Sequence, residues 1–188
     1  MNSRFKFKKT GLSGLYVVQR QVLGDQRGFL ARLFCAQEFK ELGLKQPIAQ
    51  INHTYTRKKG TVRGLHFQHP PSVETKLVSC MKGKILDVAV DIRQGSATFL
   101  QHHAEILSAE NQSSLYIPDG FAHGFQTLSD DCELLYLHTA FYEPSAEDGL
   151  NAQDTRLAVQ WPLAIAEMSE RDRNFPLLNK KFIGIEIR

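Results

Sequence analysis

Apolar and polar residues alternate along much of the chain, in short stretches separated by turn residues. The clearest alternation lies in residues 85–93, where every second residue is apolar. The apolar series begins at Leu86, whereas Asp87 and Asp91 fall on the opposite face of an extended strand. We therefore predict a strand here that packs on one side only.

Similar stretches recur along the chain at lengths typical of β-strands. The predicted strands are 15–22, 29–34, 47–54, 62–68, 76–81, 84–92, 98–107, 114–117, 123–128 and 132–138. Turn residues at 24–28 predict a hairpin between the first two, and Lys82-Gly83 predicts another. The early helical signal is 37–42, ended by Gly43.

Ten short strands at this spacing indicate an all-β sandwich or barrel with short peripheral helices. The alternation stops near Tyr142, and we interpret the remainder as a C-terminal segment that covers part of the barrel. No repeat or flexible linker divides the chain, so residues 1–188 are expected to form a single domain.

The composition is ordinary, with 42% hydrophobic and 23% charged residues and a net charge of +3. Basic residues cluster only at 6–9 and 57–59, too few for a nucleic-acid face, although a mild positive charge suits an anionic small ligand. Three distant cysteines without CxxC spacing indicate a reducing compartment. No apolar run reaches signal-peptide or membrane-span length, so a cytoplasmic protein without membrane contact is expected.

Candidate chemistry is concentrated in residues 61–93. Alternation places His66 on one face with Gly64 and Gln68, so His66 faces a polar or ligand side. If strands 62–68 and 76–81 pair as antiparallel neighbours, Lys76 lies near His66. A lone strand histidine is more often satisfied structurally than catalytic.

Neighbouring cations favour a functional interpretation of His66, because Arg63, Lys76 and His123 come from separate predicted strands of one barrel. Together they would bind a pyrophosphate or stabilise an enolate. Their structural alternative is simple surface solvation.

Other polar residues have structural interpretations on spacing alone. Asp87 and Asp91 either pair with Arg93 or lie exposed, and we assign them no role. Tyr136 would be a core or interface tyrosine.

A metal site is not predicted. Residues 118–123 have the Pro-x-Gly-x-x-His form of the second cupin motif, but the stretch matching the first motif offers only His66 where His-x-His is needed. The adjacent His102 and His103 point to opposite faces of a strand.

Eight blocks in order, between about residues 14 and 176, resemble one known family. They are Asp25-x-Arg27-Gly28-Phe29, Gln50-x-Asn52, Arg63 to Gln68, Lys76-Leu77-Val78, Asp87 to Arg93, Leu107 to Asn111, Ile117 to Phe125 and Ser169 to Asp172. This pattern is similar to the dTDP-4-dehydrorhamnose 3,5-epimerase family.

The resemblance implies a metal-free cupin jelly roll, usually a homodimer, that acts on a nucleotide-diphosphate-linked 4-keto-6-deoxyhexose without a cofactor. Protons beside the ketone are removable because the carbanion spreads onto oxygen, and inversion needs a base and an acid on opposite faces of the sugar. By the resemblance His66 is the base, Tyr136 the acid, Asp172 the orienting carboxylate and Lys76 the enolate stabiliser. The product would enter deoxysugar and surface-polysaccharide (O-antigen type) synthesis.

The resemblance also assigns substrate-binding positions. They are Arg27, Phe29, Gln50, Asn52, Arg63, Lys76, His123, Glu147 and Arg171, the last standing where Lys is common. Two departures concern Arg32, which replaces a ligand-side Glu, and Leu137, which replaces Lys. The charge reversal at Arg32 leaves the nucleotide base open.

Two alternatives therefore stay open. One is a monofunctional 3- or 5-epimerase or a 3,4-ketoisomerase of the same fold that uses a CDP-, UDP- or GDP-sugar. The other is a catalytically silent cupin that binds a nucleotide sugar. An exposed N-terminal strand could also exchange between protomers and complete the neighbour's site.

Overall fold

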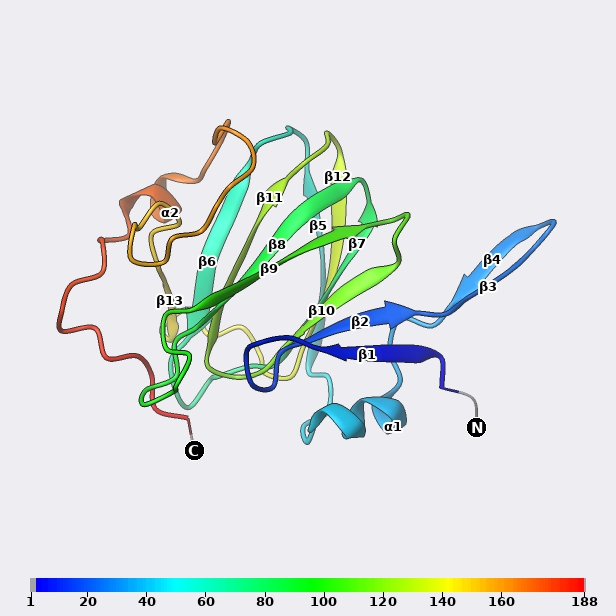
Figure 1. The fold of residues 1–188 in the computed structure, drawn as a ribbon, viewed down its shortest axis with the longest axis horizontal. Helices are drawn as coiled ribbons and strands as arrows, with labels where there is room; N and C mark the ends of the chain where they lie inside the picture. Colours follow the sequence, from blue (N-terminus) through cyan, green and yellow to red (C-terminus); the bar gives the residue numbers. More distant parts are fainter. Residues whose placement is uncertain (1–2, 188) are drawn as a thin grey trace.

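The structure, a computed structural model, describes residues 3–187 and consists mainly of two facing antiparallel sheets (Figure 1). The six-stranded sheet has, in order, β1 (Phe5–Lys9), β2 (Tyr16–Arg20), β10 (Ser113–Ile117), β7 (Lys76–Lys82), β12 (Cys132–His138) and β5 (Gln50–Thr56). The five-stranded sheet has β13 (Glu147–Gly149), β6 (Val62–Gln68), β11 (Phe121–Thr127), β8 (Lys84–Asp91) and β9 (His102–Ser108). The predicted all-β jelly roll is confirmed.

The short elements lie at the edges of this body. A separate two-stranded sheet, β3 (Val22–Asp25) and β4 (Gly28–Ala31), projects from the barrel (Figure 1). The helices are α1 (Ala36–Phe39), η1 (Lys40–Leu42) and α2 (Glu170–Asn174). The predicted helical turn before Gly43 is confirmed, and Gly43 has the left-handed φ of 86° expected of a residue that ends a helix. No helix within residues 3–187 has the length and apolar content needed to cross a bilayer.

The main core lies between the two sheets. Val78 and Leu134 of the six-stranded sheet pack in one buried cluster with Ile85 and Phe125 of the five-stranded sheet. Apolar residues alternate with outward-facing ones on these strands, so each sheet supplies one apolar face to the interior.

The prediction that the strand around residues 85–93 packs on one side is wrong. From Ile85 onward, every residue of β8 is buried. The outer face, which includes Val88, packs against Leu157, Met168 and Ile185 of the C-terminal segment. The predicted covering role of that segment is thereby confirmed, and it removes the solvent-facing side that alternation had suggested.

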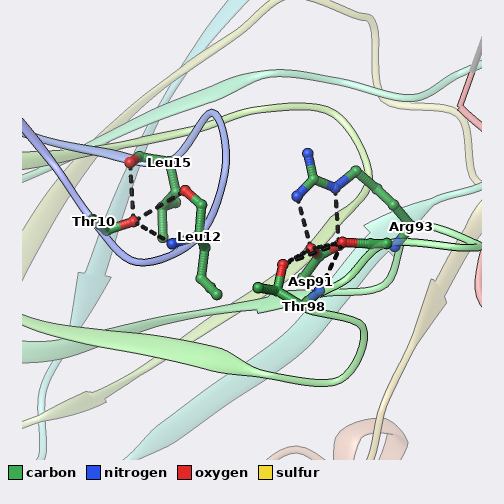
Figure 2. A network of polar contacts seen from close by, with 7 residues as sticks. Thr10, Leu12, Leu15, Asp91, Arg93 and Thr98 are labelled. Carbon is green, nitrogen blue, oxygen red and sulfur yellow. Dashed lines mark hydrogen bonds and ion pairs between the residues drawn. The ribbon is translucent and has the colours of Figure 1, made fainter.

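Asp91 is one of the structural carboxylates on this strand (Figure 2). Its oxygens accept hydrogen bonds from Arg93 Nε at 2.9 Å and from Thr98 Oγ1 at 2.6 Å. Burial alone would raise the pKa of Asp91, but hydrogen bonds from Arg93, Ser96 and Thr98 lower it to about 2. Asp91 therefore fixes the turn after β8, as the structural interpretation proposed.

Two predicted hairpin connections are also revised. β7 and β8 are not a hairpin, because the turn at Gly83, with φ of 78°, carries the chain from one sheet to the other. Near the N-terminus, β2 ends at Arg20 and joins the large sheet, whereas the hairpin is formed by β3 and β4. Local alternation locates strands but carries no information about which sheet each strand joins.

Candidate active site

A cavity of about 890 Å³ lies between the two sheets, a volume within the range of small-molecule sites. Most of the residues predicted from the sequence line it, although they come from both sheets and the C-terminal segment. They are Gln50, Asn52, Arg63, His66, Lys76, His123, Tyr136, Glu147, Arg171 and Asp172.

A β-bulge brings Arg63 and His66 to the same cavity. Simple alternation would place residues three apart on opposite faces. In the β6–β11 pairing, His66 lies opposite His123 and Arg63 opposite Phe125, so β6 carries one extra residue between the two pairs. The extra residue resets the alternation, and both side chains line the cavity.

His66 and Asp172 form a carboxylate–imidazole pair. His66 Nε2 lies 2.7 Å from Asp172 Oδ1, and the Gly64 amide donates to Asp172 Oδ2 at 3.0 Å. Helix α2 carries Asp172 and is capped at its N-terminus by Ser169, whose Oγ accepts from the Asp172 amide at 3.0 Å. A carboxylate only accepts, so Nε2 carries the hydrogen and Nδ1 of His66 has the lone pair of a neutral base.

The environment keeps Asp172 ionised. Its side chain is only 3% exposed. Burial alone would raise the pKa of Asp172, but the hydrogen bonds from His66 and the Gly64 amide lower it to about 2. The carboxylate is thus negative under all ordinary conditions and stabilises a protonated His66.

Tyr136 approaches the cavity from the other sheet. It lies on β12 of the six-stranded sheet, whereas His66 lies on β6 of the five-stranded sheet. Burial, and secondarily the nearby Asp87, raise the pKa of Tyr136 well above its ordinary value. The phenol is therefore neutral and holds a proton, opposite the His66 imidazole on the facing sheet.

Lys76 lies in a cluster that the sequence did not predict. The prediction that it neighbours His66 through strand pairing is wrong, because β6 and β7 belong to different sheets, yet both residues line the cavity. Glu74 accepts from Lys76 Nζ at 3.0 Å and from His138 Nδ1 at 2.7 Å. Burial alone would raise the pKa of Glu74, but Lys76 and His138 lower it. The His138 ring stacks on Tyr136 with centroids 5.9 Å apart.

Asp87, to which the sequence assigned no role, belongs to the site. His123 Nε2 lies 2.7 Å from Asp87 Oδ1, and both side chains are buried. The His123 ring contacts Tyr136 edge-on, with centroids 5.9 Å apart. The alternation along β8 already placed Asp87 on the face opposite Leu86. The pattern alone did not show whether that face lines the interior or is exposed to solvent.

The mouth of the cavity carries a second acidic–basic group. Arg171 Nη1 pairs with Glu147 Oε2 at 2.5 Å, and Tyr142 donates to the same oxygen at 2.9 Å. Arg171 Nη2 also lies 3.0 Å from His66 Nε2. Because Nε2 donates to Asp172, this contact with the guanidinium places positive charge beside the imidazole without a hydrogen bond between them.

Arg27 and Phe29 do not reach the cavity of their own chain. Both lie on the projecting β3–β4 hairpin, where Arg27 pairs with Asp25 and Phe29 is 65% exposed. Arg32 also lies away from the cavity and pairs with Glu38 at 2.8 Å. Leu137 is buried in an apolar cluster with Phe5 of β1 and Phe39 of α1, which accounts for an apolar residue at that position.

Comparison with known proteins agrees with this geometry. A family model described as dTDP-4-dehydrorhamnose 3,5-epimerase matches residues 9–180. The chain belongs to the dTDP-4-dehydrorhamnose 3,5-epimerase family. It is therefore an epimerase, a member of the isomerase class, and the resemblance noted from its motifs is confirmed.

Members of this epimerase family align with the chain over nearly its full length. The dTDP-4-dehydrorhamnose 3,5-epimerase of Salmonella typhimurium is 42% identical over 93% of this chain and 96% of its own. The dTDP-6-deoxy-D-glucose-3,5-epimerase of Legionella pneumophila, solved with dTDP-4-keto-L-rhamnose, superposes with a TM-score of 0.92 at 37% identity, covering 98% and 99%. A 3'-monoepimerase of Streptomyces bikiniensis, solved with dTDP-quinovose, superposes with a TM-score of 0.84 at 31% identity, covering 90% and 86%.

Within residues 3–187, no three His, Cys, Asp or Glu side chains are grouped so as to hold a metal ion. The histidines of the cavity are instead each engaged by a carboxylate, through Asp172, Asp87 and Glu74. The groups available for chemistry in the cavity are therefore acid–base side chains and the cationic side chains of Lys and Arg.

Proposed function

We propose that the substrate is a nucleotide-linked 4-keto-6-deoxyhexose of the dTDP-4-dehydro-6-deoxyglucose type, inverted at C3 and C5 to the dTDP-4-dehydrorhamnose configuration. The observation that carries this proposal is the placement of His66 on one sheet, paired with Asp172 of helix α2, and of Tyr136 on the facing sheet, across one cavity. Inversion at carbon requires a base and an acid on opposite faces. The product would serve deoxysugar and surface-polysaccharide synthesis.

In the proposed reaction, His66 Nδ1 removes the proton beside the C4 ketone. The electron pair moves onto the ketone oxygen and forms an enolate, and the positive charge on His66 is stabilised by Asp172. Tyr136 then delivers its phenolic proton to the opposite face of the same carbon, which restores the ketone. His66 releases its proton to solvent and Tyr136 regains one from solvent, and the same steps then invert the second carbon. Lys76 supplies positive charge where the enolate oxygen develops. No cofactor is required, because the substrate's own ketone supplies the electron sink.

Substrate binding is assigned to the remaining polar groups of the cavity. Arg63 and Arg171 supply positive charge for the diphosphate, and arginine binds phosphate oxygens with paired donors. Gln50 and Asn52 line the same cavity from β5 and offer amide groups to the sugar or nucleotide. Glu147 holds Arg171 in place through their ion pair, and His123 is held ready for the sugar by Asp87.

We also propose that the protein is a homodimer in which each β3–β4 hairpin completes the partner's site. A projecting two-stranded sheet is marginally stable alone. β5 is an edge strand with a free hydrogen-bonding side, and it lines the cavity through Gln50 and Asn52. A hairpin docked there from a second copy would bring Arg27 and Phe29 to the site that they do not reach within one chain.

Two further proposals concern the chain as a whole. We propose that residues 1–188 act as a single domain, because the C-terminal segment packs into the same body as both sheets. A cytoplasmic location is supported by three unpaired cysteines, Cys35, Cys80 and Cys132.

The test is proton NMR in deuterated water with dTDP-, CDP-, UDP- and GDP-linked 4-keto-6-deoxy sugars. Loss of both the C3 and the C5 proton signals with the dTDP sugar is the expected result. Exchange at one carbon only would make the enzyme a monoepimerase. Exchange only with a sugar linked to another nucleotide would indicate that the charge reversal at Arg32 changes which nucleotide base is accepted.

The silent-binder alternative is tested with His66→Ala and Tyr136→Phe. Both substitutions should strongly reduce epimer formation while leaving binding of dTDP within a few-fold of the wild type. If turnover survives both substitutions unchanged, the assigned roles are wrong. If the wild type binds a sugar of the panel but exchanges no proton, the protein is a binder.

A further inference from the structure

Arg20, the last residue of β2, is a buried cation without a counter-charge. The residue is 3% exposed. Its Nε donates to the Gln112 carbonyl oxygen at 3.1 Å, and its Nη1 lies 4.0 Å from Met81 Sδ. Throughout the described residues 3–187, its guanidinium makes no other hydrogen bond and no ion pair.

Most of the other buried charges in residues 3–187 have an ionic partner, although Asp154 accepts only from the backbone amides of Arg156 and Leu178. Lys76 pairs with Glu74, Asp91 with Arg93, and Asp172 with His66. An unpaired buried charge is costly, and a guanidinium does not escape the cost by losing its proton. Burial lowers the pKa of Arg20, but arginine remains protonated at every ordinary pH.

Arg20 lines a cavity of about 410 Å³, here called the Arg20 cavity. Leu30 and Leu33 line it on the side of the hairpin, and Met81 and Gln112 line it on the side of the barrel. Within residues 3–187, no acidic residue lines it, and it shares no lining residue with the active-site cavity of the same chain. Phe29, which the hairpin is proposed to bring to the partner's site, also lines it. The Arg20 cavity therefore joins one unneutralised cation to apolar walls.

We propose that the Arg20 cavity is a binding site for a carboxylate group attached to a small apolar body. The terminal N–H groups at Nη1 and Nη2 form the planar fork that accepts a carboxylate bidentately. A monoanion is favoured over a phosphate dianion because a single arginine would leave one phosphate charge buried and unpaired. The carboxylate comes either from a free ligand or from an acidic side chain of a second copy of this chain.

The proposal is tested by thermal unfolding of the wild type, Arg20→Met and Arg156→Met in increasing sodium acetate, butyrate or phosphate. Arg156 is the matched control, because it is exposed and its guanidinium also donates to a single backbone carbonyl, that of Asn179. Anion binding at the active-site cavity and general salt effects act on all three proteins alike. Only a site at Arg20 makes the wild type and Arg156→Met differ from Arg20→Met.

For a free carboxylate, butyrate should raise the unfolding midpoint of the wild type by about 3 to 6 °C at ten times its dissociation constant. Arg20→Met should lose this rise, and phosphate should give less than butyrate. An Arg20 Nε–Hε NMR signal that shifts saturably with butyrate in the wild type provides the same test should Arg20→Met fail to fold.

If the carboxylate belongs to a second copy, the wild type should instead gain nothing from butyrate. On dilution, Arg20→Met should dissociate from dimer to monomer at a protein concentration at least tenfold higher than the wild type does. The molar mass from light scattering measures this dissociation. The proposal is overturned if neither the butyrate response nor the dimer dissociation differs between Arg20→Met and Arg156→Met. Because the NMR exchange assay reads the active-site cavity alone, failure of this proposal leaves the epimerase proposal untouched, and the converse also holds.

Discussion

Replacement of Asp172 by Asn removes the charge that orients the proposed base while preserving the shape of the side chain. Asp172 Oδ1 accepts from His66 Nε2 at 2.7 Å, and Oδ2 accepts from the Gly64 amide at 3.0 Å. Asn retains one acceptor oxygen but presents an NH₂ group as well, so it favours the wrong imidazole tautomer. The corresponding change in the serine-protease triad lowers kcat by about 10⁴, and we expect a loss of about 10³ to 10⁴ here.

The stability cost follows from the pKa of the carboxyl group. Lowering this pKa from 3.8 to about 2 corresponds to about 2 kcal/mol of native-state stabilisation of the carboxylate. Because the folded-state pKa is the lower one, this stabilisation is fully present above about pH 4 and disappears as the pH falls towards 2. The side chain is 3% exposed, so solvent screening reduces the figure little.

The assay is urea unfolding of wild type and Asp172→Asn at pH 7 and at pH 3, together with kcat from epimer formation. We expect a difference of about 2 kcal/mol in the free energy of unfolding at pH 7 and a smaller one at pH 3. Glu105→Gln is the matched control, because it alters the partly exposed carboxylate–imidazole pair with His103 outside the cavity. An unchanged kcat in Asp172→Asn, or a stability difference that grows with acid, would refute the reasoning.

Four further outcomes are expected. Tyr136→Phe should lower kcat for epimer formation by about 10² to 10⁴ while deuterium still enters the starting sugar through His66, as NMR would show; loss of both would contradict separate roles for acid and base. Lys76→Met should lower kcat by about 10² to 10³ in steady-state assays, and a change confined to KM would exclude enolate stabilisation. Glu74→Gln should cost about 1–3 kcal/mol in urea unfolding, because it weakens the shared contacts to Lys76 and His138; equal stability would show that those contacts contribute nothing. Leu134→Ala, at a fully buried core position, should cost about 2–5 kcal/mol in the same assay with kcat retained, and a cost below 1 kcal/mol would place it outside the core.

The sequence by itself determined the strands and most of the site residues. The strands predicted at 62–68 and 132–138 have the bounds of β6 and β12, because alternation and turn residues are local properties that each segment carries. The family motifs likewise identified His66, Tyr136 and Asp172, since motif residues are readable wherever the chain later places them. Their meeting at one cavity was expected from the resemblance, and the structure places all three there.

Only the tertiary structure decided how those strands combine. Successive strands such as β6, β7 and β8 alternate between the sheets, and this depends on long-range pairing that local periodicity does not encode. The second covered face of β8 and the role of Asp87 follow from that arrangement. Glu74 joined the site for the same reason, because its contact with His138 links residues 64 positions apart. Such contacts form only when distant segments pack, so no pattern within either segment predicts them.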